Sequence, residues 1–123
     1  MSKQKTILVV EDEKDLVDLL KIRLESLGYK VIYALDGQEG LDVLKSQKPD
    51  LVILDIMMPK LDGISVLLKL KANKQTKDIP VLILSVIGEE EEKSIAKKLG
   101  AVAYVNKPFS NEVLISKIKS ILQ

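Results

Sequence analysis

The chain has 123 residues, the usual size of one domain, and its 46% hydrophobic and 30% charged residues are the balance of a globular protein. It has no cysteine and no histidine, which excludes a disulfide framework, a zinc site built from those residues, a thiol nucleophile and a Ser-His triad. The 19 Lys plus Arg against 18 Asp plus Glu leave a net charge of +1, so no strong basic field favours nucleic acid.

Five short apolar runs divide the chain, and each is predicted to be a strand. Four of them are almost continuous in Val, Ile and Leu, which is typical of strands buried on both faces of a sheet. The second run is mixed with tyrosine, which suits a strand nearer an edge. The runs are Ile7–Val10, Val31–Ala34, Leu51–Leu54, Val81–Leu84 and Val102–Val105.

A helical pattern follows each predicted strand. Apolar residues repeat at helical spacing from Leu16 to Leu27, and Gly28 then ends the first helix. Ser110 is expected to cap the last helix. The remaining patterns cover Gln38–Ser46, Ile64–Ala72, Ser94–Leu99 (opened by the acidic run Glu89–Glu92) and Val113 to Leu122. The alternation predicts an α/β fold, with a five-stranded parallel sheet and helices on both of its faces.

No linker, low-complexity stretch or apolar run of about 18 residues interrupts this alternation. We therefore expect a single domain over residues 1–123, with no output domain in this chain and no membrane-spanning helix. The expected location is the cytoplasm.

Polar side chains stand where the predicted strands end. Glu11 and Asp12 follow the first strand, Asp55 ends the third, Ser85 ends the fourth and Lys107 follows the fifth. Ligands of open parallel sheets bind at this edge. Because two carboxylates 4 Å apart repel by about 4 kcal/mol at an effective dielectric of 20, a hard divalent cation such as Mg²⁺ (or Mn²⁺) is expected among these acids.

The residues at this edge suit phosphoryl chemistry without a glycine-rich phosphate loop. Neither a P-loop motif nor a dinucleotide fingerprint occurs in the sequence. Asp55 is the candidate nucleophile, which would form an acyl phosphate, and Lys107 and Ser85 could bind the phosphoryl oxygens. Each residue alone has a simpler reading: Asp12 also fits a helix N-cap, Lys107 a surface turn and Tyr104 a half-buried strand residue.

With these residues at its strand ends, the sequence resembles the receiver domain of bacterial two-component response regulators, the CheY-like family, over essentially the whole chain. The matching segments are V-V-E-D at Val9–Asp12, L-D-I-M-M-P at Leu54–Pro59, D-G at Asp62–Gly63, the hydroxyl of Ser85, and Y-V-N-K-P-F at Tyr104–Phe109. The resemblance implies the flavodoxin-like strand order 2-1-3-4-5, which CheY itself exemplifies, in a three-layer α/β/α sandwich with five helices.

The resemblance also implies a role for each site residue. Asp55 is the phosphoryl acceptor, and Lys107 binds the phosphoryl group. Glu11, Asp12 and Asp55 form the Mg²⁺ site, together with the backbone carbonyl of Met57. Ser85 and Tyr104 form a switch pair, in which the hydroxyl moves toward the phosphoryl group and the ring turns inward.

The implied function is a phosphorylation-dependent signalling switch of a two-component phosphorelay. Its donor would be a sensor histidine kinase or a histidine phosphotransfer protein, and it would catalyse only its own phosphorylation and dephosphorylation. The changed surface would comprise Glu89–Leu99, Tyr104 and Val113–Leu122 and would control a partner or effector. The chain itself is expected to bind neither nucleic acid nor membrane, and to be a monomer or a phosphorylation-dependent dimer.

Two other functions fit the same fold. One is a receiver-fold interaction module that is never phosphorylated, which the complete acidic, hydroxyl and lysine set disfavours. The other is a magnesium phosphatase with an aspartyl intermediate. Enzymes of the haloacid dehalogenase type carry a second aspartate two residues after the nucleophile, and here that position is Met57.

Three positions depart from the commonest family pattern. Position 11 is Glu rather than Asp, and Ser85 replaces the commoner Thr. Val86 is larger than the alanine that usually follows this hydroxyl, so we expect it to narrow the path of small phosphodonors to Asp55. Met57 and Ile87 are apolar and cannot orient an attacking water, which predicts slow self-dephosphorylation.

Overall fold

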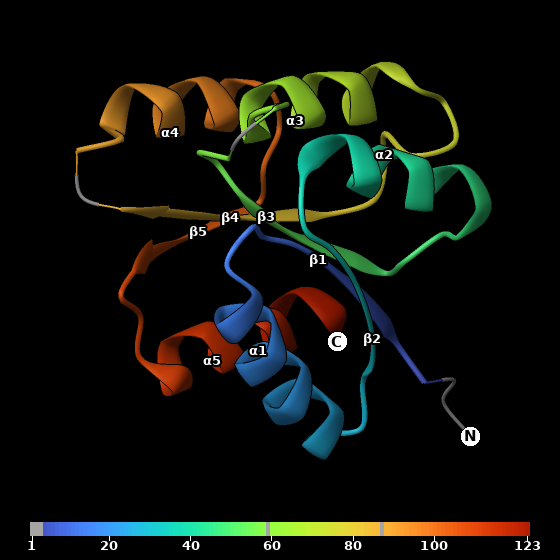
Figure 1. The fold of residues 1–123 in the computed structure, drawn as a ribbon, viewed down its shortest axis with the longest axis vertical. Coiled ribbons are helices and arrows are strands. Elements are labelled where there is room, and N and C mark those ends of the chain that lie inside the picture. The colour runs from blue at the N-terminus through green and yellow to red at the C-terminus, as the bar shows by residue number, and fades with distance from the viewer. Residues whose placement is uncertain (1–3, 59, 87) are drawn as a thin grey trace.

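A computed structural model describes residues 4–58, 60–86 and 88–123. Strands and helices alternate along the chain (Figure 1). Their bounds are β1 (Thr6–Val10), α1 (Lys14–Ser26), β2 (Lys30–Ala34), α2 (Gly37–Ser46), β3 (Leu51–Asp55), α3 (Gly63–Ala72), β4 (Val81–Val86), α4 (Glu90–Lys98), β5 (Ala103–Lys107) and α5 (Asn111–Leu122). The predicted alternation is confirmed. The predicted end of the fifth strand is wrong, because Asn106 and Lys107 belong to the strand rather than following it.

The five strands are parallel and lie in the order β2-β1-β3-β4-β5, as the family resemblance implied. Helices α1 and α5 cover one face of the sheet, and α2, α3 and α4 cover the other (Figure 1). The second strand is an edge strand, as its mixed composition predicted. The fold is therefore a flavodoxin-like three-layer sandwich.

Alternate residues of the central strands fill two separate cores. In β1, Ile7 and Val9 pack with α1 and α5, whereas Leu8 and Val10 pack with α3 and α4. All five residues of β3 are buried. Because both faces of these strands lose contact with water, the nearly continuous Val, Ile and Leu runs are stabilising at every position.

Side-chain caps fix where three of the helices begin. Asp36 Oδ1 accepts from Glu39 N–H at 2.8 Å at the start of α2, and Asp62 Oδ1 accepts from Ser65 N–H at 2.8 Å at the start of α3. The predicted cap of the last helix is confirmed, because Ser110 Oγ accepts from Val113 N–H at 3.1 Å.

The sequence predicted the end of α1 correctly but not the residue that caps its start. Its N-cap is Glu13 and not Asp12, so the cap interpretation of Asp12 is wrong. Gly28 follows the helix with φ of +95°, a left-handed conformation that suits glycine and explains the stop. Across the residues that the structure describes, none of the helices combines the length and apolar character that a membrane crossing requires.

Candidate functional site

The carboxyl ends of β1 and β3 bring three acids together. These strands are neighbours, with Val10 paired to Leu54, so the residues that follow Val10 lie beside Asp55. Glu11, Asp12 and Asp55 each offer a carboxylate oxygen, and these oxygens lie within 4.8 Å of one another. The chain leaves β1 for one side of the sheet and β3 for the other, which is the topological switch point where such folds bind ligands.

The three acids differ in how far they are exposed to solvent. Glu11 is fully buried, Asp55 is 5% exposed and Asp12 is exposed. Backbone donors reach two of them: Glu13 N–H donates to Glu11 Oε2 at 3.1 Å, and Met57 N–H donates to Asp55 Oδ1 at 3.3 Å. Glu11 Oε1 is also buried, and it lies 2.6 Å from the Lys107 ammonium nitrogen. A buried carboxylate oxygen favours a cation as its partner.

Lys107 supplies the positive charge of the site. Its Nζ lies 2.6 Å from Glu11 Oε1, and it donates a hydrogen bond to Asp55 Oδ2 at 3.3 Å. A third carboxylate oxygen, Glu13 Oε1, lies 3.6 Å away. The ammonium group therefore bridges two buried acids, and a single positive charge leaves this acidic group incompletely neutralised.

The pKa values reflect this balance. Burial raises the pKa of Glu11 from 4.5 to about 7, against the opposing effect of Lys107. Burial also raises the pKa of Asp55, although Lys107 opposes it. Burial lowers the pKa of Lys107, but its contacts with Glu11 and Asp55 outweigh that effect and raise the pKa above 10.5. Lys107 is thus charged at neutral pH, and Glu11 is close to its titration point in the metal-free protein.

The donor set fits Mg²⁺. All three side chains offer hard oxygen ligands, the chain has no nitrogen or sulfur ligands from His or Cys, and the two buried acids share one lysine as their cation. Exposed Asp12 leaves one side of the group open to water, which suits an ion that keeps part of its hydration shell.

A glycine fixes the loop that follows Asp55. Gly63 N–H donates to the Ile56 carbonyl at 3.0 Å, so α3 begins directly against the end of β3. A Cβ at position 63 would clash with the Asp55 carbonyl oxygen and would lie 2.6 Å from Ile56 Cα. Only glycine permits this approach without moving the backbone of the candidate acceptor.

The predicted switch residues lie at the neighbouring strand ends. Ser85 is 1% exposed, and its Oγ donates to Asn106 Oδ1 at 3.3 Å. The Tyr104 hydroxyl donates to the Ala101 carbonyl at 3.2 Å, so it is directed toward the amino end of β5 and away from Ser85. Lys93 Nζ lies 5.6 Å from the centre of the tyrosine ring.

Two further predicted positions border the site. Val86 pairs with Lys107 in the sheet and is 44% exposed, and it lines a hollow of about 490 Å³ together with Lys107, Pro108 and Phe109. The Met57 side chain is 52% exposed. Ile87, the other apolar position on which the expectation of slow self-dephosphorylation rests, lies outside the described residues.

Sequence reasoning missed two members of the site. Glu13 contacts Lys107, and Asn106 accepts the hydrogen bond of Ser85. The acidic run Glu11–Glu13 was a usable signal for the first. The position of Asn106 beside Lys107 was a weaker signal for the second, because its pairing with Ser85 depends on the register of β4 and β5.

Comparisons with known proteins agree with this geometry. The family model described as response regulator receiver domain matches residues 7–119. Alkaline phosphatase synthesis transcriptional regulatory protein PhoP of Bacillus subtilis is 45% identical over 97% of this chain and 49% of its own length. DNA-binding dual master transcriptional regulator RpaA of Synechocystis is 38% identical over 95% of this chain and 48% of its own length. The chain thus spans about half the length of these relatives.

Solved structures share the fold of this chain at lower sequence identity. A putative response regulator from Chloroflexus aurantiacus aligns with a TM-score of 0.91 at 32% identity, over 98% of both chains. Chemotaxis response regulator CheY4 of Vibrio cholerae aligns with a TM-score of 0.91 at 28% identity, over 98% of this chain and 100% of its own.

Proposed function

This chain belongs to the response regulator receiver domain family, and from that premise we propose that it is a phosphorylation-dependent switch with Asp55 as its phosphoryl acceptor. One observation carries the proposal. The carboxylates of Glu11, Asp12 and Asp55 converge, and Lys107 Nζ lies 2.6 Å from Glu11 and 3.3 Å from Asp55. An ion pair between one lysine and one acid would serve stability alone, whereas a surplus of buried negative charge suits cation and phosphoryl binding.

The proposed reaction transfers a phosphoryl group from a phosphohistidine of a sensor kinase or phosphotransfer protein. An Asp55 oxygen attacks phosphorus and forms the new O–P bond. The P–N bond to the donor imidazole breaks, and its electron pair stays on the ring nitrogen. Lys107 then faces the phosphoryl oxygens as a point charge, and the Ser85 hydroxyl donates to one of them.

Glu11, Asp12 and Asp55 are proposed to hold Mg²⁺, with the Met57 backbone carbonyl as a further ligand. When bound, the ion would supply positive charge against Asp55 and the incoming phosphoryl oxygens. That charge would also favour the ionised form of Glu11 and Asp55, whose pKa values burial raises in the metal-free protein.

The signal is proposed to leave the site through Ser85 and Tyr104. In this structure the Ser85 hydroxyl donates a hydrogen bond to Asn106 Oδ1, and the Tyr104 hydroxyl donates one to the Ala101 carbonyl. New charge-assisted hydrogen bonds to a phosphoryl group, each contributing roughly 1.5–3 kcal/mol, are enough to shift a two-state equilibrium between these contacts and an alternative set. The responding surface is α4, β5 and α5, and relatives that are transcriptional regulators suggest control of transcription by a partner or domain outside this chain.

The test is the intact mass of the protein after incubation with Mg²⁺ and acetyl phosphate, repeated with a phosphorylated histidine kinase. We expect one added phosphoryl group, which is absent in Asp55→Asn and in metal-free protein. If Val86 obstructs small donors, Val86→Ala will be labelled faster by acetyl phosphate, while labelling by the kinase changes little. Failure of both donors to label wild-type protein and Val86→Ala refutes the proposal and leaves an interaction module.

A further inference from the structure

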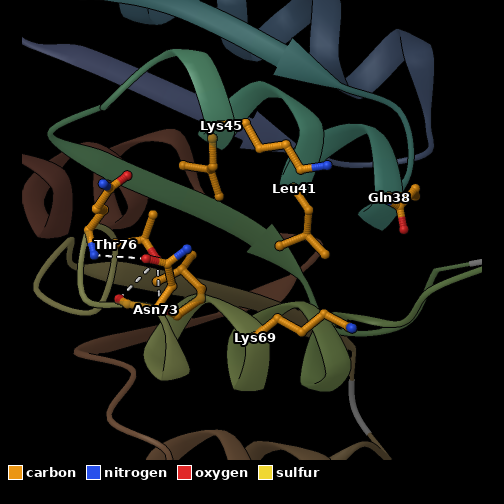
Figure 2. Close-up of a pocket in the computed structure, with 9 residues that line it drawn as sticks. Gln38, Leu41, Lys45, Lys69, Asn73 and Thr76 are labelled. Atoms are coloured by element: carbon orange, nitrogen blue, oxygen red, sulfur yellow. Dashed lines mark hydrogen bonds between the residues drawn. The ribbon is translucent and has the colours of Figure 1, made fainter.

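A groove lies between α2 and α3, away from the acidic site. It holds a hollow of about 370 Å³ whose apolar lining residues are Leu41, Leu44 and Leu70, and Figure 2 labels Leu41 among them. Leu70 is buried, whereas Leu41 and Leu44 are half-buried. Thr76 also lines the hollow, and its Oγ1 donates to the Leu70 carbonyl at 2.6 Å. Leu41 and Leu44 are therefore the apolar surface that the fold leaves partly open here.

Lysines border this apolar surface on both sides. Lys45 of α2 and Lys69 of α3 lie on opposite sides of the hollow (Figure 2). Two adjoining hollows share Gln75 with the first one; Lys48 lines both of them and Lys74 lines one. The side chains that line the first hollow thus include two lysines and no acid, whereas Asp50 and Asp78 line an adjoining hollow together with Lys48 and Lys74.

Nearby acids neutralise little of this charge. Lys45 Nζ lies 3.4 Å from Asp42. Among the described residues, Lys48, Lys69 and Lys74 form no ion pair within 4 Å. Asp50 and Asp78 line an adjoining hollow, but neither lines the hollow that holds Lys45 and Lys69. The groove thus offers positive charge to an outside partner.

We propose that this groove binds an acidic peptide segment of a partner protein. A leucine-sized side chain of the peptide packs on Leu41 and Leu44, and carboxylates on either side pair with Lys45 and Lys69. A peptide fits better than an enclosed small ligand, because the groove carries polar side chains, Gln38 and Asn73, toward its two ends rather than closing over its apolar surface. The proposal goes beyond the phosphorylation switch and requires no phosphoryl group.

The experiment uses the whole unphosphorylated chain, labelled with ¹⁵N, and the peptide acetyl-Glu-Asp-Leu-Glu-Glu-amide. We expect saturable shifts of the Leu41, Leu44 and Thr76 amide signals with a dissociation constant below about 1 mM. The double variant Lys45→Ser and Lys69→Ser should weaken binding at least fivefold. A peptide with serine in place of leucine should bind at least threefold more weakly, since it cannot use the apolar surface.

The matched control is the double variant Lys98→Ser and Lys119→Ser, which removes the same charge from exposed positions of α4 and α5. It should bind the peptide as tightly as the wild type. Equal weakening in both double variants, equal binding of the leucine-free peptide, or the absence of saturable shifts would each overturn the proposal. The first two results would mean that only long-range charge attracts the peptide.

Discussion

Metal-free protein should lose stability as the pH rises from about 5.5 to 7.5, and Glu11 should be the main cause. Burial raises its pKa from 4.5 in the unfolded chain to about 7 in the folded one. The folded state therefore holds the proton to a higher pH than the unfolded state. The stabilising contribution is complete below 4.5 and is lost as the pH rises through about 7.

The size of the effect follows from the two pKa values. At about 1.4 kcal/mol for each pH unit between 4.5 and about 7, the whole contribution is about 3 kcal/mol, and about 2 kcal/mol of it falls between pH 5.5 and 7.5. Asp55 acts in the same direction, because its pKa is also raised. Lys107, whose pKa is raised above 10.5, changes nothing in this window.

Urea unfolding followed by circular dichroism, in chelator at several pH values, measures this slope. Glu11→Gln carries a neutral amide and should lose about 2 kcal/mol of the pH dependence between 5.5 and 7.5. Asp12→Asn, at an exposed position of the same acidic group, is the matched control and should keep the wild-type slope. Added Mg²⁺ should flatten the wild-type curve at high pH by binding the folded state. An unchanged slope in Glu11→Gln, or wild-type stability that rises across this window, would refute the reasoning.

Three further outcomes are expected. Gly63→Ala should destabilise the protein by about 2 kcal/mol or more in urea unfolding and weaken Mg²⁺ binding by calorimetry, because the new Cβ pushes the backbone of Asp55 and Ile56. Normal Mg²⁺ affinity in this variant would contradict the link between loop and site. Lys107→Met should cost about 3–5 kcal/mol of unfolding free energy in metal-free protein at pH 8, since two buried acids lose their cation; a loss below about 1 kcal/mol would count against it. Met57→Asn should speed decay of phosphorylated Asp55, measured by intact mass over time, because an exposed polar group can orient water; an unchanged decay rate would oppose this role.

The sequence by itself determined the alternation of strands and helices, because strands buried on both faces need nearly continuous apolar runs. It also placed Glu11, Asp12 and Asp55 at strand ends, and the family resemblance supplied the strand order that the structure confirms. The end of the fifth strand could not be predicted this way. Asn106 and Lys107 are polar, yet they pair with Ser85 and Val86 on an edge strand, where pairing does not require burial.

Only the tertiary structure decided which charges of the site lie in contact and how far each is buried. Lys107 lies far from Glu11 in the chain, and the parallel register alone brings its ammonium group to 2.6 Å from that carboxylate. The burial that raises the pKa of Glu11 arises from packing among neighbouring strands and loops, which no local pattern encodes. The close approach of Gly63 to Asp55 and the lysine-bordered apolar surface between α2 and α3 likewise depend on distances between elements, which spacing along one helix or strand does not determine.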